Sequence, residues 1–135
     1  RVVVNNRVRE GQPDSAAHVV QEIAAAGGNG IVETSDVTDD GAAERMVERA
    51  LQTYGRLDGI IFNAGITGDA KRFVDMDAAN FDLVMATNFA SVVRLTRHAL
   101  PTLRKSPSAL RVQACTVFEV VRRMHHPRGL CRPLL

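Results

Sequence analysis

The feature that most constrains this 135-residue chain is an alternation between two hydrophobic periodicities over residues 1–105. Short apolar runs, typical of buried strands, alternate with segments whose apolar residues recur every three or four positions, typical of amphipathic helices. Strands are expected over 2–4, 30–34 and 58–62, and helices over 14–26, 43–54 and 78–103. Strand–helix units repeated in this way predict an α/β protein with a doubly wound parallel sheet covered on both faces.

Two of the expected helices have well-defined apolar stripes. The first consists of Ala43, Met46, Val47, Ala50, Leu51 and Tyr54. The second consists of Phe81, Val84, Asn88, Val92, Leu95, Ala99 and Leu103. We expect Asp14 to help begin the helix over 14–26, and Gly27 and Gly28 to end it. Asp39 is expected to cap the helix over 43–54, where the helix dipole also favours Asp39 and Asp40. Pro101 is expected to kink or shorten the last turn of the helix over 78–103.

The charge is unevenly distributed along the chain. Residues 1–108 carry a net charge of −2, whereas residues 109–135 carry +4 and hold both cysteines, Cys115 and Cys131. Aromatic residues make up 4% of the chain and no segment approaches the length of a membrane span, so neither a nucleic acid nor a membrane is expected as a partner. Two late cysteines form no disulfide framework, which favours a reducing, cytoplasmic location, and the absence of Met at position 1 suggests a natural start upstream.

Polar or glycine-bearing triplets follow the three expected strands. They are 5–7 (Asn-Asn-Arg), 35–37 (Ser-Asp-Val) and 63–65 (Asn-Ala-Gly). Open parallel sheets bind ligands outside the carboxyl ends of their strands, so these triplets mark the expected site. Asp36 could accept a hydrogen bond from a ligand amine or could only fix its own turn. Asn63 and Gly65 could likewise line a ligand or form an ordinary turn.

Asn88 is the one amide within an otherwise apolar helical stripe. A buried amide without partners costs about 1–3 kcal/mol. We therefore expect Asn88 to be satisfied by backbone groups, by water or within a site.

Considered together, these segments resemble the short-chain dehydrogenase/reductase family over about residues 1–109. The matching segments are 2–5 (Val-Val-Val-Asn), 35–38 (Ser-Asp-Val-Thr), 54–65 (Tyr-Gly-Arg-Leu-Asp-Gly-Ile-Ile-Phe-Asn-Ala-Gly), and 80–82 (Asn-Phe-Asp) leading to 87–89 (Thr-Asn-Phe). The resemblance implies a Rossmann-like sheet and an NAD(P)-dependent oxidoreductase that acts on a carbonyl or alcohol substrate.

The resemblance also assigns roles to individual residues. Asp36 and Val37 would hold the adenine ring of the cofactor. The triplet that lines the cofactor would consist of Asn63, Ala64 and Gly65. Asn88 would be the active-site asparagine, which holds a water in the proton relay.

The cofactor preference follows from charge after the first expected strand. NAD-specific members of the family carry an acidic residue at this place, where this chain has Asn6 and Arg7. An arginine can pair with the 2′-phosphate of NADP, so we expect NADP(H) to be preferred over NAD(H). Alternatively, Arg7 is a solvated loop residue.

The resemblance further implies that parts of the family's fold are absent from this chain. The first strand with its glycine-rich turn would precede Arg1, and would lie between the strands over 2–4 and 58–62. The catalytic Tyr-x-x-x-Lys is missing, since the single tyrosine, Tyr54, is followed four residues later by Asp58. We therefore expect a truncated, inactive form, or else a non-catalytic nucleotide-binding remnant. A signalling receiver module would fit the periodicity but not the Asn-Ala-Gly triplet with Asn88.

The last stretch does not resemble the family. We expect a partial NAD(P)-binding domain over 1–109 and a divergent basic tail over 110–135, produced by a frame shift, an alternative exon or a gene-model error. His125, His126 and Cys131 lie in this tail, but their spacing predicts no metal site. A homo-oligomer is expected only for the complete form.

Overall fold

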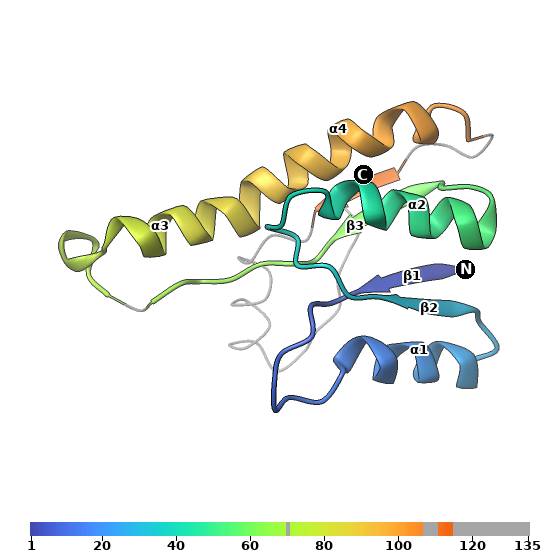
Figure 1. Cartoon of the computed structure of the whole chain (residues 1–135), viewed down its shortest axis with the longest axis horizontal. Coiled ribbons are helices and arrows are strands. Elements are labelled where there is room, and N and C mark those ends of the chain that lie inside the picture. The colour runs from blue at the N-terminus through green and yellow to red at the C-terminus, as the bar shows by residue number, and fades with distance from the viewer. Residues whose placement is uncertain (70, 107–110, 115–135) are drawn as a thin grey trace, which may run out of the picture.

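The computed structural model describes residues 1–69, 71–106 and 111–114 (Figure 1). It contains two pairs of parallel strands, β1 (Val2–Asn5) with β2 (Gly30–Glu33), and β3 (Gly59–Phe62) with β4 (Arg111–Ala114). The predicted α/β class with parallel strands is confirmed. In the described parts of the chain β1 and β3 belong to separate sheets, so they do not pair directly.

The helices lie where the periodicity predicts them. They are α1 (Ser15–Ala25), α2 (Ala42–Tyr54), α3 (Ala78–Met85) and α4 (Ser91–Leu103), with a single π-helical turn, Ala86–Ala90, between the last two. A short 3-10 turn, Phe73–Asp75, precedes α3. None of the helices among the described residues is long and apolar enough to cross a membrane.

The helix starts show one confirmed and one wrong prediction. Asp14 caps α1 by accepting hydrogen bonds of 3.0 Å from the backbone N–H groups of Ala16 and Ala17. At α2 the capping position is Gly41, with φ of 74° and no side-chain cap, so the expected capping by the Asp39 side chain is wrong. A left-handed turn at glycine starts this helix instead.

Packing of α2 against α4 forms the core. Val47, Ala99 and Leu103 are buried there, and Leu51, Leu57, Ile60 and Leu95 pack around them. Because α2 also contacts β1 while Ile60 belongs to β3, the two helices connect the two sheets. In Figure 1, α2 lies above β1 and β2 and α1 lies below them, while α4 lies above β3 and β4.

The long helix differs from its prediction in two places. Phe81, expected on the inward stripe, leaves 51% of its surface exposed. This half of the helix projects beyond the sheets and has little to pack against (Figure 1). Pro101 lies inside α4, which continues to Leu103, so its last turn is not shortened.

The predicted tail is described in part. Its residues 111–114 form β4, which pairs with β3. Residues 107–110 and 115–135 lie outside the described residues, and Cys115, His125, His126 and Cys131 are among them. The proposed boundary at residue 109 therefore stays a prediction.

Candidate functional site

The loops that follow β1 and β2 meet through an ion pair. Nη1 of Arg7 lies 2.5 Å from Oδ2 of Asp36, and the two side chains are 42% and 21% exposed. The loops also meet at Asn5, whose amide donates to the backbone oxygen of Ser35 at 3.0 Å. Two of the triplets predicted from the sequence are therefore in direct contact.

Asp36 also fixes its own turn. Its Oδ1 accepts hydrogen bonds from the backbone N–H of Thr38 at 2.9 Å and from the Thr38 hydroxyl at 2.7 Å. Burial alone would raise the pKa of Asp36, but the bonds from Thr38 and Arg7 lower this pKa to about 2. The carboxylate is thus held charged, and the turn-forming interpretation of Asp36 is correct whether or not a ligand amine also binds there.

The remaining residues of these two loops are placed less directly. Asn6 donates a hydrogen bond to the hydroxyl of Ser15, at the start of α1. Val37 is half-buried in the loop that Asp36 closes.

The third triplet follows β3 on an exposed loop. Asn63, Ala64 and Gly65 are all exposed, which leaves them accessible to a ligand. The next residue, Ile66, is held by Asn88 through two hydrogen bonds of 2.8 Å. The backbone N–H of Ile66 donates to Oδ1, and Nδ2 donates to the Ile66 oxygen. The amide in the apolar stripe is therefore satisfied by backbone groups, one of the predicted options.

One continuous helix brings the loops together. Asn88, in the π-helical turn, holds the loop after β3, and Arg94, in α4, donates from Nη1 to the backbone oxygen of Thr38 at 3.2 Å. The two anchors are six positions apart, which corresponds to about 9 Å along a helix axis. The turn of Asp36 and the Asn-Ala-Gly loop are therefore placed against the same segment of helix.

The π-helical turn itself is a local departure from regular helix. The backbone N–H of Ser91 bonds to the oxygen of Ala86, five residues back. Isolated π turns within α-helices occur frequently at functional sites. Asn88 lies at the middle of this turn, so the residue predicted for the active site lies in a helix irregularity of the kind found at functional sites.

Thr38, Arg94 and Asn80 have roles in the site that the sequence does not predict. Thr38 could have been found, because an aspartate two residues before a threonine is typical of an Asx turn. Arg94 gave no signal, since an arginine on the polar side of a helix is ordinarily a solvated residue. Asn80 accepts a hydrogen bond from the backbone N–H of Asp69 at 3.2 Å, and its place in a family motif does not indicate this contact.

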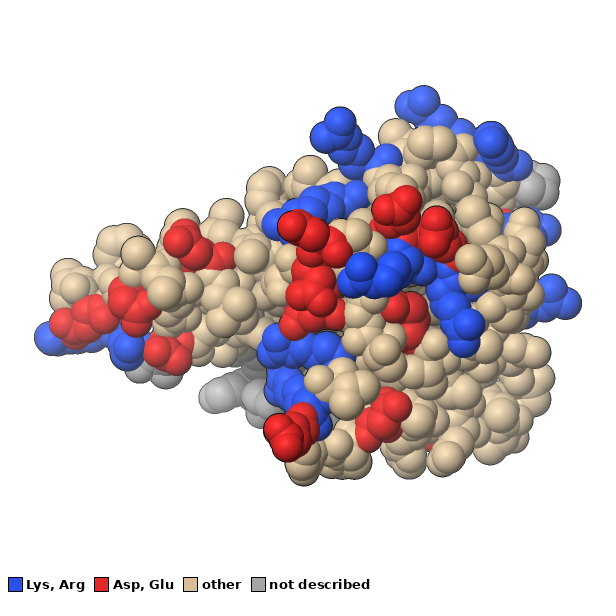
Figure 2. Space-filling model, in the orientation of Figure 1, with Lys and Arg blue, Asp and Glu red and all other residues tan. Residues whose placement is uncertain are grey.

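A shallow groove of about 370 Å³ lies elsewhere, between β2 and α2. Its lining is mostly charged or polar and includes Glu33, Arg45, Glu48 and Arg49. None of the residues predicted for the cofactor site lines it. On the face shown in Figure 2, basic and acidic side chains are intermingled over this region.

Several known proteins resemble this chain in sequence. The family model described as enoyl-(acyl carrier protein) reductase matches residues 7–126. An uncharacterized oxidoreductase of Schizosaccharomyces pombe is 32% identical over 98 residues, which are 73% of this chain and 33% of that protein. The 3-oxoacyl-[acyl-carrier-protein] reductase FabG of Thermotoga maritima is 34% identical over 85 residues, which are 63% of this chain and 34% of that protein.

Solved protein structures also resemble this chain in fold. A short chain dehydrogenase from Mycobacterium avium aligns with a TM-score of 0.70 and 33% identity, over 84% of this chain and 43% of that one. An NADH-dependent reductase, A1-R′, solved in complex with NAD, aligns with a TM-score of 0.67 and 28% identity, over 82% of this chain and 47% of that one. This chain spans about a third of the two curated relatives and less than half of the two solved chains. It belongs to the short-chain dehydrogenase/reductase family of NAD(P)-dependent oxidoreductases, and its strands and helices are part of that family's Rossmann fold.

Proposed function

We propose that the complete form of this protein transfers hydride between NAD(P)H and a carbonyl or alcohol substrate. The observation that carries the proposal is the placement of two strand-end loops against one helix, by Asn88 and Arg94. The nicotinamide supplies the hydride chemistry, and the protein binds and orients it.

The described residues fit a dinucleotide. The exposed loop of Asn63, Ala64 and Gly65 lets a ligand approach the backbone closely, because its residues carry small side chains after the first. Asp36 and Val37 would hold the adenine ring. Oδ1 of Asp36 already accepts two hydrogen bonds from Thr38, so an adenine amine would bond to Oδ2, next to Arg7. A carboxylate has about four acceptor positions, which leaves capacity for this bond.

We further propose that NADP(H) is preferred over NAD(H). Arg7 stands after β1, contacts Asp36 through Nη1 and remains 42% exposed at its side chain. A guanidinium has five N–H donors, so Arg7 can bind a phosphate while it keeps its ion pair. Asn6 lies beside it, and neither residue repels a 2′-phosphate. Arg9, also exposed in the same loop, provides a matched control.

Fluorescence titration of the chain with NADPH and NADH tests both proposals. Arg7→Ala should weaken NADPH binding by about tenfold, the effect of one lost charge-assisted hydrogen bond, and should leave NADH binding within about twofold. Arg9→Ala should change neither. Equal losses for both dinucleotides would contradict the 2′-phosphate role of Arg7, and no binding of either by the unchanged chain would contradict the cofactor site.

We propose that this chain by itself has no dehydrogenase turnover. Its single tyrosine, Tyr54, is at the end of α2, where its hydroxyl donates to Oδ1 of Asn29 at 2.9 Å. Tyr54 therefore has a structural role, and this sequence has no Tyr-x-x-x-Lys motif to supply a proton donor. NADPH oxidation with common ketones should stay at the background rate, and measured turnover would contradict this. Dinucleotide binding without turnover would also favour the alternative of a nucleotide-binding remnant or pseudoenzyme.

A homo-oligomer of the complete form is also proposed. Apolar side chains spaced by four residues are left exposed along the long helix, namely Phe81, Met85, Phe89 and Val93. Residues 69–82, before and within α3, carry a net charge of −2 and α4 carries +2, so a second copy in antiparallel orientation would be complementary in charge. Sedimentation of the complete form should detect a dimer, and Phe89→Ser should dissociate this dimer. A complete form that is monomeric at every concentration would contradict the proposal. The cytoplasmic location and the absence of nucleic-acid and membrane partners stay predictions.

A further inference from the structure

The loop after β3 is fixed mainly by side chains. Over residues 64–68, the hydrogen bonds found within the described chain involve the side chains of Asn88 and Thr67 rather than backbone–backbone pairs. A loop without its own backbone bonds depends on such anchors for its conformation. Asn88 holds only one end of this loop, at Ile66.

The other end of the loop is held by Asn80, in the first turn of α3. Its Oδ1 accepts the backbone N–H of Asp69 at 3.2 Å. Asn80 is itself placed by the helix start, since its backbone N–H donates to Oδ1 of Asp77 at 2.7 Å. The acceptor oxygen therefore projects from a fixed point.

Gly68 shows that the loop lies directly on this helix. Its φ of 69° is in the left-handed region. A Cβ at this position would overlap Oδ1 of Asn80 and would lie 2.7 Å from Cγ2 of Val84. No other residue type fits there without displacing Asn80 or Val84, so this contact depends on glycine.

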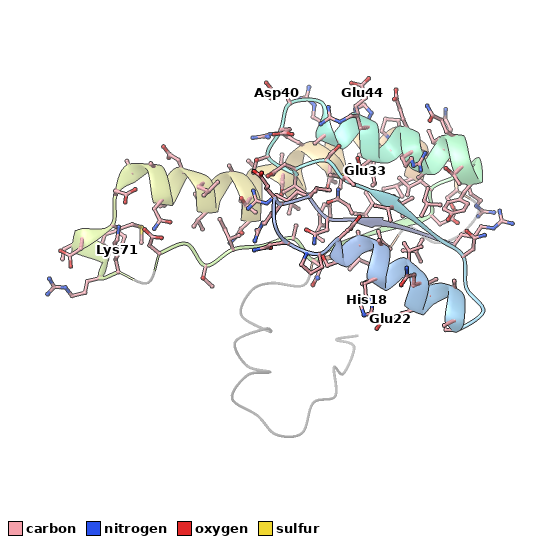
Figure 3. The ribbon with its side chains drawn as sticks, turned by 60° about the horizontal axis from the view of Figure 1, so that its bottom comes forward. His18, Glu22, Glu33, Asp40, Glu44 and Lys71 are labelled. Carbon is pink, nitrogen blue, oxygen red and sulfur yellow. The ribbon has the colours of Figure 1, made fainter. Side chains whose placement is uncertain are left out.

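The three contacting residues, Asn80, Val84 and Asn88, form one ridge. They are spaced by four, and residues four apart lie on the same side of a helix. Asn88, at the end of this ridge, lies in the π-helical turn. Figure 3 shows Lys71, which follows the loop, beside the outer end of α3. Lys71 pairs there with Asp69 and Asp77, at 3.1 Å and 3.3 Å.

We propose that Asn80 is a positioning residue, which with Asn88 clamps the loop after β3 and thereby orients Asn63–Gly65 towards the dinucleotide. The inference rests on the proposed cofactor site. It adds a residue to that site which touches neither cofactor nor substrate. Asn80 acts through the backbone N–H of Asp69, whereas Asn88 acts through both backbone groups of Ile66.

The test combines amide hydrogen exchange with NADPH titration of the 135-residue chain. Asn80→Ala should speed exchange over residues 66–69 and weaken NADPH binding by about three- to tenfold, the effect of one lost hydrogen bond. Asn80→Asp keeps the acceptor oxygen and places a carboxylate in the first turn of α3, where the helix dipole favours it, so it should restore both measurements. Asp82→Ala, on the exposed side of the same helix, is the control and should change neither.

Each outcome decides the proposal. Faster exchange in Asn80→Ala with unchanged NADPH affinity would overturn the positioning role, and so would unchanged exchange. If Asn80→Ala does not fold, the Asn80→Asp variant and the unchanged chain still decide, because NADPH should slow exchange over residues 66–69 in both. The failure of the unchanged chain to bind NADPH would overturn the proposed cofactor site and the orienting role with it. The exchange data would then still report whether Asn80 fixes the loop.

Discussion

Replacing Asn88 with alanine gives the sharpest test of how the site is held together. The change removes both hydrogen bonds to Ile66, each of 2.8 Å. A net value of about 0.5–1.5 kcal/mol for each bond predicts a loss of about 1–3 kcal/mol in the free energy of unfolding. Because Asn88 is half-buried, water can reach part of the freed backbone groups, which favours the middle of this range.

Helix propensity acts in the opposite direction. Alanine is a better helix former than asparagine by about 0.5 kcal/mol. The expected net effect of Asn88→Ala is therefore a loss of about 1.5 kcal/mol. If the carboxamide contributed nothing, the same change would stabilise the chain slightly, so the sign of the effect separates the two cases.

Urea unfolding followed by far-ultraviolet circular dichroism measures this effect. With a slope of about 1–2 kcal/mol per molar urea for a chain of this size, the midpoint should fall by about 1 M. Asp82→Ala, on the exposed side of α3, should leave the midpoint unchanged or raise it slightly. Asn88→Asp should be at least as harmful as Asn88→Ala, because a carboxylate oxygen would face the Ile66 oxygen. A midpoint for Asn88→Ala equal to or above that of the unchanged chain would refute the reasoning.

Three further predictions concern neighbouring contacts. The pKa of Asp36 is lowered from 3.8 to about 2, so its contribution to stability, at most about 2 kcal/mol, is complete above pH 3.8 and is lost as the pH falls through 2. The difference in unfolding free energy between the unchanged chain and Asp36→Asn should shrink from pH 5 to pH 2, and a constant difference would contradict the shift. Gly68→Ala should cost about 2–4 kcal/mol in urea unfolding, from its left-handed backbone and the overlap with Asn80, and a loss below about 0.5 kcal/mol would contradict the close contact. Arg94→Ala should change stability by less than about 1.5 kcal/mol but should speed amide exchange over residues 36–39, and unchanged protection there would show that Arg94 does not hold this loop.

Much of the fold follows from local patterns in the sequence. The apolar stripe of α2 predicts its buried side, and Val47 and Ala50 are buried as expected. Asp14 and the glycines after α1 predict both ends of that helix. These predictions succeed because periodicity and caps act over a few residues, within which the chain's own chemistry decides the conformation.

The features that local sequence patterns do not predict depend on partners distant in the sequence. Phe81 has the spacing of a core residue, but no element of the described structure covers it, so it stays exposed. No residue pattern marks the π-helical turn, which is recognised only from its backbone hydrogen bond. The hydrogen bond from Arg94 to Thr38 joins residues 56 positions apart, and the sequence around neither residue predicts it.

The same distinction applies to the candidate site. The sequence predicts which residues follow each strand, but not how the loops are brought together, because β1 and β3 share no ladder in the described structure. The loops are related instead through helices, since α2 connects the two sheets while Asn88 and Arg94 each hold one loop. Side-chain anchors on a helix thus define the geometry that a shared strand ladder would otherwise impose. The spacing of the cofactor loops should therefore be more sensitive to changes on the long helix than to changes within the strands.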